Sequence, residues 1–240
     1  MQAHPAESPQ TLVLSYLAIR RAIGYVGLSL PILLGPIGWL VHGIGLQENM
    51  SSYYHTPMRD IFVGVMCAIG IFLFCYRGYS RWEEWTGNVS CVSAIVIALC
   101  PLDANSDPLH QRTFVGYMHS AAGAAFFTTL AVYSLFHFPR RKSEDSLPET
   151  SHPSELDRRA RNLVYYVSGG VIVLCLIAMG SSFFLMPTRL RETLDSWGFV
   201  FWMEWIAVWA FSAAWLAKGR ALFADVAVPL GRLQQIIRRR

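Results

Sequence analysis

The chain has 240 residues, of which 53% are apolar and only 15% are charged, against about 25% charged residues in an ordinary soluble domain. This composition argues against a soluble protein and indicates a membrane protein. The net charge of +4 does not indicate nucleic-acid binding, because the aromatic residues lie inside apolar segments rather than among the basic residues. We therefore expect membrane lipids, and no nucleic acid, as partners.

Six apolar segments follow one another along the chain, each close to the roughly 20 residues that a bilayer-spanning helix needs. They cover approximately residues 22–43, 60–76, 87–102, 113–137, 163–186 and 198–217. The connections between them are short, so residues 1–240 are expected to form a single integral membrane domain. The predicted fold class is all-α, a polytopic bundle of six transmembrane helices.

The basic residues predict how these helices are oriented. Of the 20 Lys and Arg residues, 16 lie before the first segment, after the second, between the fourth and fifth, or after the sixth. Short loops rich in Lys and Arg remain on the cytoplasmic side of a membrane. Both termini are therefore expected in the cytoplasm.

Other features predict local structure in chain order. Pro31 and Pro36 predict a bent first helix, because proline cannot donate the usual backbone hydrogen bond. Glycines in the fourth and fifth segments favour close helix packing in lipid. Residues 138–162 are rich in Pro, Ser, Glu and Arg and predict a mobile cytoplasmic loop. Residues 219–240 alternate apolar residues with arginines and predict an amphipathic tail on the inner membrane surface.

Three ionisable residues, Asp60, His119 and Glu204, lie inside the apolar segments. Such residues are costly in a bilayer and often mark functional sites. His119 and Glu204 each lie about six residues, or roughly 9 Å, below the outer start of their helix. Asp60 lies in the first turn of its helix, and His55 lies just outside the membrane in the same region. We predict that these four residues form a polar site near the outer surface.

A histidine together with two carboxylates can bind a divalent metal such as zinc and leave an open position for water. The leading hypothesis is a membrane-embedded, metal-assisted hydrolase that acts on a lipid-like substrate from the outer leaflet. His119 would be a metal ligand or general base, and Asp60 and Glu204 would be ligands or the acid–base group. His55 is a further candidate ligand.

Other functions remain open at this point. The same ionisable residues suit a small transporter coupled to protons or cations. Each could instead have a structural role, for example Asp60 paired with Arg59 or Arg112. The glycine- and alanine-rich helix faces suit a non-catalytic scaffold or assembly partner, and a homo-oligomer is left open.

The run SSYYHTPMRDIFVG at residues 51–64 resembles a segment of a bacterial family of uncharacterised six-helix membrane proteins. The runs FWME at 201–204 and WLAKG at 215–219 resemble the end of the same family. The resemblance implies a multi-pass protein of a bacterial inner membrane, and it implies no activity.

A second likeness is to the alkaline-ceramidase-like (CREST) superfamily of membrane hydrolases, which place a serine, an aspartate and several histidines at a metal site. Ser51 or Ser52, Asp60 and His119 would correspond to that set. The superfamily has seven spans, and its last helix supplies a pair of histidines. The last apolar segment of this chain instead supplies Glu204.

Overall fold

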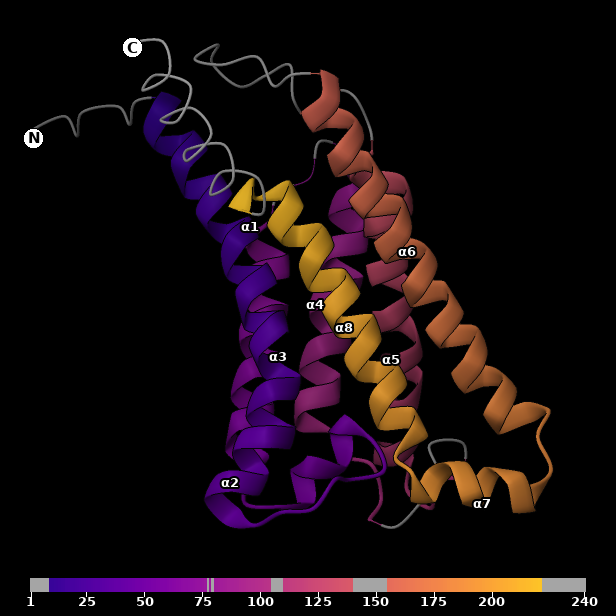
Figure 1. Cartoon of the computed structure of the whole chain (residues 1–240). Helices are drawn as coiled ribbons and strands as arrows, with labels where there is room; N and C mark the ends of the chain where they lie inside the picture. Colours follow the sequence, from indigo (N-terminus) through magenta and orange to yellow (C-terminus); the bar gives the residue numbers. More distant parts are fainter. Residues whose placement is uncertain (1–8, 77, 79, 105–109, 140–154, 222–240) are drawn as a thin grey trace, which may run out of the picture.

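The part of the chain that the structure describes is helical throughout. The computed structural model describes residues 9–76, 78, 80–104, 110–139 and 155–221, and every regular element within them is a helix. The long helices form a bundle (Figure 1). They are α1 (Pro9–Ile32), α3 (Arg59–Cys75), α4 (Arg81–Leu99), α5 (Phe114–Val132), α6 (Glu155–Phe184) and α8 (Phe199–Lys218). The shorter elements are η1 (Leu33–Ile37), α2 (Gly38–His42), η2 (Met50–His55), η3 (Tyr133–His137) and α7 (Thr188–Ser196).

Each predicted apolar segment overlaps one long helix, and the described residues are all-helical, so the all-α fold class is confirmed. α1 begins at Pro9, well before the predicted start near residue 22. The start of α4 differs from the prediction, because this helix begins at Arg81 rather than near residue 87. Ser80 caps it, with the Ser80 hydroxyl oxygen accepting the backbone N–H of Glu83 at 3.3 Å. Glu83 and Glu84 in the first turn also interact favourably with the helix dipole. These local interactions extend the helix beyond its apolar part.

Two further differences concern the predicted loops. α6 begins at Glu155, so the last part of the predicted loop 138–162 is helical. α7 was not predicted, since its sequence is polar and short, and it crosses the end of the bundle between α6 and α8 (Figure 1). Residues 140–154, and the predicted amphipathic tail from residue 222 onward, lie outside the described residues.

The first long helix changes geometry at its second proline, from an α-helix to a π-helix. α1 passes directly into η1, a π-helical turn that contains Pro36. Proline lacks the N–H that an α-helical turn requires, and a wider π turn accommodates the interruption. α2 follows and ends at Gly43, whose φ of 65° lies in the left-handed region that favours glycine.

Three of the described helices are long and apolar enough to cross a membrane by length and hydropathy. They cover Tyr16–His42, Arg158–Phe184 and Phe199–Lys218. The other long helices, α3, α4 and α5, have 17, 19 and 19 residues. These lengths correspond to roughly 25–29 Å, close to the hydrocarbon thickness of a bilayer.

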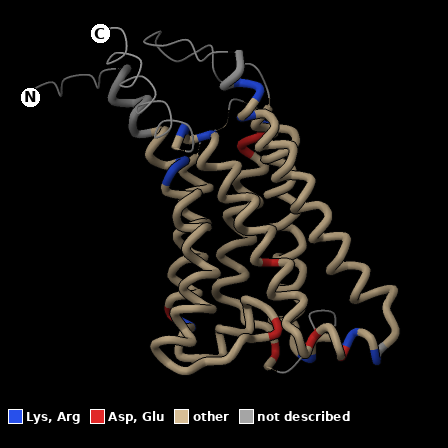
Figure 2. The backbone as a smooth tube through the Cα atoms, in the orientation of Figure 1, with Lys and Arg blue, Asp and Glu red and all other residues tan. Residues whose placement is uncertain are grey.

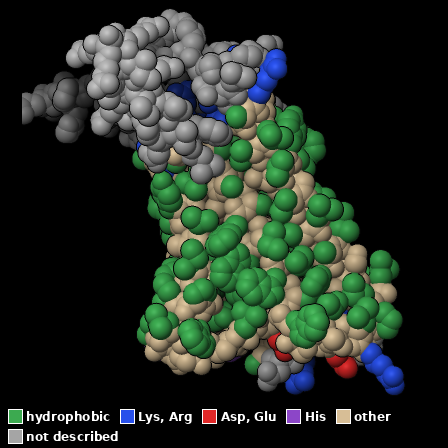
Figure 3. Space-filling view, in the orientation of Figure 1, with side chains coloured by type: hydrophobic (Ala, Val, Ile, Leu, Met, Phe, Trp, Pro, Cys, Tyr) green, Lys and Arg blue, Asp and Glu red, His purple; other side chains and the backbone are tan. Residues whose placement is uncertain are grey.

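Charged residues gather at the two ends of the bundle. Figure 2 shows mainly Lys and Arg at the end where α1 begins and α8 finishes, and both signs of charge at the end that carries α7. We call these the basic end and the α7 end. Figure 3 shows hydrophobic side chains over the middle of the visible face. Arg21 joins α1 to the finish of α8, since its Nε donates to the Gly219 carbonyl at 2.8 Å.

Buried aromatic rings and one carboxylate hold four helices together at the basic end. The ring of Tyr76 packs against those of Tyr133 and Trp215, with centroid distances of 6.0 and 4.8 Å. The hydroxyl of Tyr76 donates to Oε1 of Glu83 at 2.8 Å, and the hydroxyl of Tyr133 donates to the Glu83 carbonyl at 3.2 Å. This network closes the basic end of the bundle around three aromatic side chains that are almost fully buried.

Candidate functional site

The segment before α3 carries two buried residues into the α7 end of the bundle. Asn49 caps η2, and its Oδ1 accepts both the backbone N–H of Ser52 at 2.8 Å and the hydroxyl of Ser52 at 3.1 Å. The capped turn places Met50 and Ser51 inside the protein, where both are buried. A polar side chain of the loop therefore reaches the interior next to α5 and α8.

His119 of α5 is held at both ring nitrogens and is only 4% exposed. Nδ1 lies 2.6 Å from the carbonyl oxygen of Cys100, and Nε2 lies 2.8 Å from the hydroxyl oxygen of Ser51. A carbonyl oxygen can only accept a hydrogen bond, so Nδ1 carries the proton in the neutral ring. Nε2 is then the acceptor, and the hydroxyl of Ser51 donates to it. The imidazole is thus oriented so that its unprotonated nitrogen, Nε2, faces the hydroxyl of Ser51.

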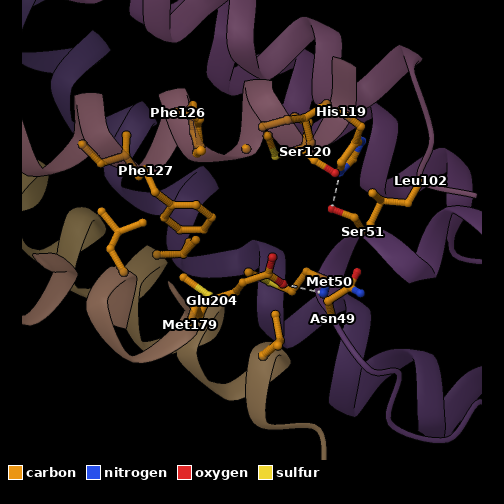
Figure 4. A pocket seen from close by; sticks show the side chains of 18 of the residues that line it. Asn49, Met50, Ser51, Leu102, His119, Ser120, Phe126, Phe127, Met179 and Glu204 are labelled. Atoms are coloured by element: carbon orange, nitrogen blue, oxygen red, sulfur yellow. Dashed lines mark hydrogen bonds between the residues drawn. The ribbon is translucent and has the colours of Figure 1, made fainter. Parts of the chain in front are cut away.

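Glu204 of α8 lies on another wall of the same region. Its Oε2 accepts the backbone N–H of Met50 at 2.7 Å. This hydrogen bond ties α8 to the residue directly before Ser51. Figure 4 shows Ser51 and His119 pointing toward each other, with Glu204 projecting into the same cavity. Glu204 therefore helps to set the position of Ser51 through the backbone of η2.

A cavity of about 310 Å³ lies between these groups and extends into the bundle. The volume lies at the lower end of the roughly 300–1,000 Å³ that is usual for small-molecule sites. The polar side chains that line it are those of Asn49, Ser51, His119, Ser120 and Glu204. The rest of the wall is apolar and includes phenylalanine, leucine, isoleucine and methionine side chains from six helices. The cavity thus has one polar part and a long apolar part.

The start of α5, and with it the depth of His119, is set by Asp103. The carboxylate of Asp103 accepts the hydroxyl of Thr113 at 2.7 Å and the backbone N–H of Thr113 at 2.9 Å, and also the backbone N–H of Arg112. Thr113 in turn caps α5 by accepting the N–H of Gly116 at 3.1 Å. The hydrogen bonds from the side chain and then the backbone of Thr113 lower the pKa of Asp103. The charged form of Asp103 therefore supports this cap.

The structure brings together two of the four predicted site residues. His119 and Glu204 line the same cavity, whereas Asp60 and His55 do not. Asp60 is exposed in the first turn of α3. His55 is also exposed, and its Nε2 lies 2.8 Å from the carbonyl oxygen of Leu102. The shared depth of these residues was therefore not sufficient to place all four at one site.

The described residues also offer no ready metal centre. Within them, no group of three or more His, Cys, Asp or Glu side chains is arranged to hold a metal ion. The polar part of the cavity instead contains a serine and a histidine in direct contact.

Sequence reasoning singled out Ser51 only through a family likeness. The hydrogen bond between His119 and Ser51 had no other signal in the sequence than the likeness that names Ser51 or Ser52 as a site residue. The carbonyl of Cys100 and the N–H of Met50 leave no signal in the sequence, because every residue carries these backbone groups.

Comparison of the chain with protein-family models, with curated proteins and with solved structures finds no match. Functional inference therefore relies on the geometry of the site.

Proposed function

We propose that this chain is a multi-pass protein of a bacterial inner membrane and that its cavity is the active site of a serine-dependent hydrolase acting on lipid-like esters or amides. The observation that carries the proposal is the 2.8 Å contact between the hydroxyl of Ser51 and Nε2 of His119, at the polar part of an apolar cavity. The reaction class keeps the lipid-active hydrolase of the sequence hypothesis and replaces its metal with a nucleophilic serine.

The membrane placement is supported by the surface of the bundle. Three helices meet the length and hydropathy of a membrane span, and α3, α4 and α5 pack alongside them over a similar height. The basic end gathers most of the described Lys and Arg residues (Figure 2). In the proposed orientation this end faces the cytoplasm, following the preference of basic loops for that side. The polar part of the cavity then lies in the outer half of the membrane.

The Ser51–His119 pair can carry out acyl transfer. Oγ of Ser51 attacks the carbonyl carbon of the substrate while its proton passes to Nε2 of His119. The imidazolium then protonates the leaving oxygen or nitrogen as the bond to the acyl carbon breaks. Water, deprotonated by Nε2, hydrolyses the acyl–Ser51 ester and restores the serine. The carbonyl of Cys100 keeps the proton on Nδ1 throughout, which is the orienting role that a carboxylate has in many such sites.

A fluorophosphonate probe tests this proposal, because it reacts with serines that have a basic partner. We expect the purified protein to be labelled at Ser51, as located by peptide mass spectrometry. Ser51→Ala should abolish labelling, whereas Ser52→Ala should retain it, since the hydroxyl of Ser52 donates to Asn49. His119→Gln should slow labelling by roughly 10²–10⁴-fold, the usual contribution of a general base. Labelling that is absent, or that persists in Ser51→Ala with an unchanged melting temperature, would refute the proposal.

A chelator separates the serine mechanism from the metal-assisted one. Labelling of Ser51 is expected to be unchanged after treatment with EDTA. A loss that zinc restores would favour the metal-assisted hydrolase instead.

The transporter and scaffold hypotheses have less support. The polar side chains that line the cavity lie near the α7 end, whereas Ile69, Leu130 and Phe211 make its deeper wall apolar. A proton or cation path would need polar groups beyond this wall. In a scaffold the hydrogen bond between Ser51 and His119 would only tie η2 to α5, and fluorophosphonate would not label Ser51.

A further inference from the structure

The cavity has one open side, and that side lies between α5 and α6. Nearly all the lining residues from α1, α3, α4, α8 and η2 are buried, and Glu204 is the one that is partly exposed. The other partly or fully exposed lining residues all belong to α5 and α6. They are Ser120, Gly123, Ala124, Phe127, Leu176, Gly180, Phe183 and Phe184.

The two helices are close at one level and separated at another. A Cβ added at Gly169 of α6 would lie 2.4 Å from Cγ of Leu135, so α6 packs tightly at the level of η3. A Cβ added at Gly180 of α6 or at Gly123 of α5 would meet nothing within 4 Å. Figure 1 shows α6 slanting away from α5 as it approaches α7. The gap therefore widens from Gly169 toward the α7 end.

This opening faces the side of the bundle rather than its end. Phe184, at the edge of the cavity, is 74% exposed, and large apolar side chains elsewhere on α6, such as Leu174 and Ile177, are exposed as well. In a membrane these surfaces contact lipid chains. A molecule that uses the opening would come from the bilayer and would not need to cross water.

The cavity begins at His119, five residues after the start of α5, and its length along that helix is close to the thickness of one leaflet. Its lining extends along α5 from His119 to Leu130, which is eleven residues or roughly 16 Å. Half of a bilayer hydrocarbon core is about 15 Å thick. Since the deep wall is apolar and the polar groups lie near the α7 end, an acyl chain fits with its carbonyl group next to Ser51.

We propose that the cavity binds one acyl chain of a membrane lipid, which enters sideways from the outer leaflet through the opening between α5 and α6. The chain lies along α5 with its end near Leu130, and its ester or amide carbonyl lies at Ser51. This inference adds the substrate class and the access route to the proposed hydrolase. The lipid headgroup then projects toward the α7 end.

The experiment uses full-length Ser51→Ala protein, so that binding is measured without turnover. The protein is placed in lipid nanodiscs with a phosphatidylcholine that carries a photoreactive diazirine near the end of one acyl chain. We expect cross-links to cavity residues of α5 and α8, located by mass spectrometry. Diazirine-labelled palmitate in a parallel sample tests whether a free fatty acid occupies the cavity instead of a bilayer lipid.

Two matched leucine substitutions on α6 test the access route. Gly180→Leu fills the opening, and Gly170→Leu places the same side chain on the same helix at a position that does not line the cavity and where an added Cβ also meets nothing within 4 Å. We expect Gly180→Leu to lower cavity cross-linking at least about ten-fold, a loss of about 1.4 kcal/mol in binding, and Gly170→Leu to leave it unchanged. Gly123→Leu, on the opposite wall, should act like Gly180→Leu.

The outcomes separate this inference from the proposed chemistry. Equal cross-linking in Gly180→Leu and Gly170→Leu, cross-links confined to the outer surface, or binding of palmitate in preference to phospholipid would overturn the inference. Fluorophosphonate labelling of Ser51 is therefore measured in the wild type and in the Gly170→Leu protein, where the opening is not filled. Cavity cross-linking without any labelling of Ser51 would remove the hydrolase and leave the acyl-chain site standing.

Discussion

Replacing Gly169 with alanine is expected to weaken the contact that closes the basic-end side of the gap between α5 and α6. The new Cβ would lie 2.4 Å from Cγ and 2.5 Å from Cδ2 of Leu135, and 3.2 Å from Cβ of Ser134. No carbon atom tolerates the shortest of these distances, so Leu135 or the helix must move. Gly170 is the control, because its added Cβ would meet nothing within 4 Å.

The magnitude follows from two opposing effects. Extra carbon in a packed region costs about 1–3 kcal/mol, whereas alanine in place of glycine within a helix gains about 1 kcal/mol. Gly169→Ala carries both effects, so we expect it to be destabilised by about 0–2 kcal/mol. Gly170→Ala carries only the gain. The helix-propensity effect cancels between neighbours, which leaves a difference of about 1–3 kcal/mol in favour of Gly170→Ala.

Unfolding of the purified protein in detergent, followed by tryptophan fluorescence during titration with denaturant, measures this difference. Each variant is compared with the wild type in the same detergent. A Gly169→Ala protein that is as stable as Gly170→Ala would show that α6 does not pack against η3 as described. In that case the contrast between a closed and an open part of the gap would also be lost.

Three other predictions concern single side chains. Glu204→Gln should keep fluorophosphonate labelling of Ser51 within a few-fold of wild type, because the amide oxygen still accepts the backbone N–H of Met50. Glu204→Ala should lower the labelling. An equal loss in both variants would indicate a role for the charge itself. Hydrogen bonds at the start of α5 lower the pKa of Asp103, so its stabilising effect is complete above the ordinary pKa of 3.8 and is lost as pH falls through the lower folded-state value. Melting temperatures of wild type and Asp103→Asn should therefore differ at neutral pH and converge in acid, and a gap independent of pH would contradict this. Tyr76→Phe removes a hydrogen bond to the buried carboxylate of Glu83 and should lower the free energy of unfolding by about 1.5–3 kcal/mol. Tyr133→Phe should lower it by only about 0.5–1.5 kcal/mol, because the Tyr133 hydroxyl donates to a backbone carbonyl. A denaturant titration that ranks the two variants in the opposite order would contradict this network.

The depth of side chains along the helices was predictable, and their direction around the helix axis was not. Asp60 and Phe62 lie two positions apart on α3, so they differ by about 200° around its axis. Phe62 is 2% exposed and lines the cavity, and Asp60 therefore faces outward. His119 and Glu204 have the same predicted depth, and their helices happen to be rotated so that both point inward.

The long helices and the basic end can be derived from the amino-acid sequence. Hydropathy and charge are sums over the residues of one segment, and they do not depend on which other helix that segment packs against. Local capping by Ser80 and Thr113 then adjusts where helices begin. The cavity required the folded chain, because it depends on the tilt of α6, on the rotation of each helix, and on backbone groups of Met50 and Cys100 that are chemically the same in every residue. Only packing in three dimensions brings a loop hydroxyl, an imidazole from α5 and a carboxylate from α8 to one apolar space.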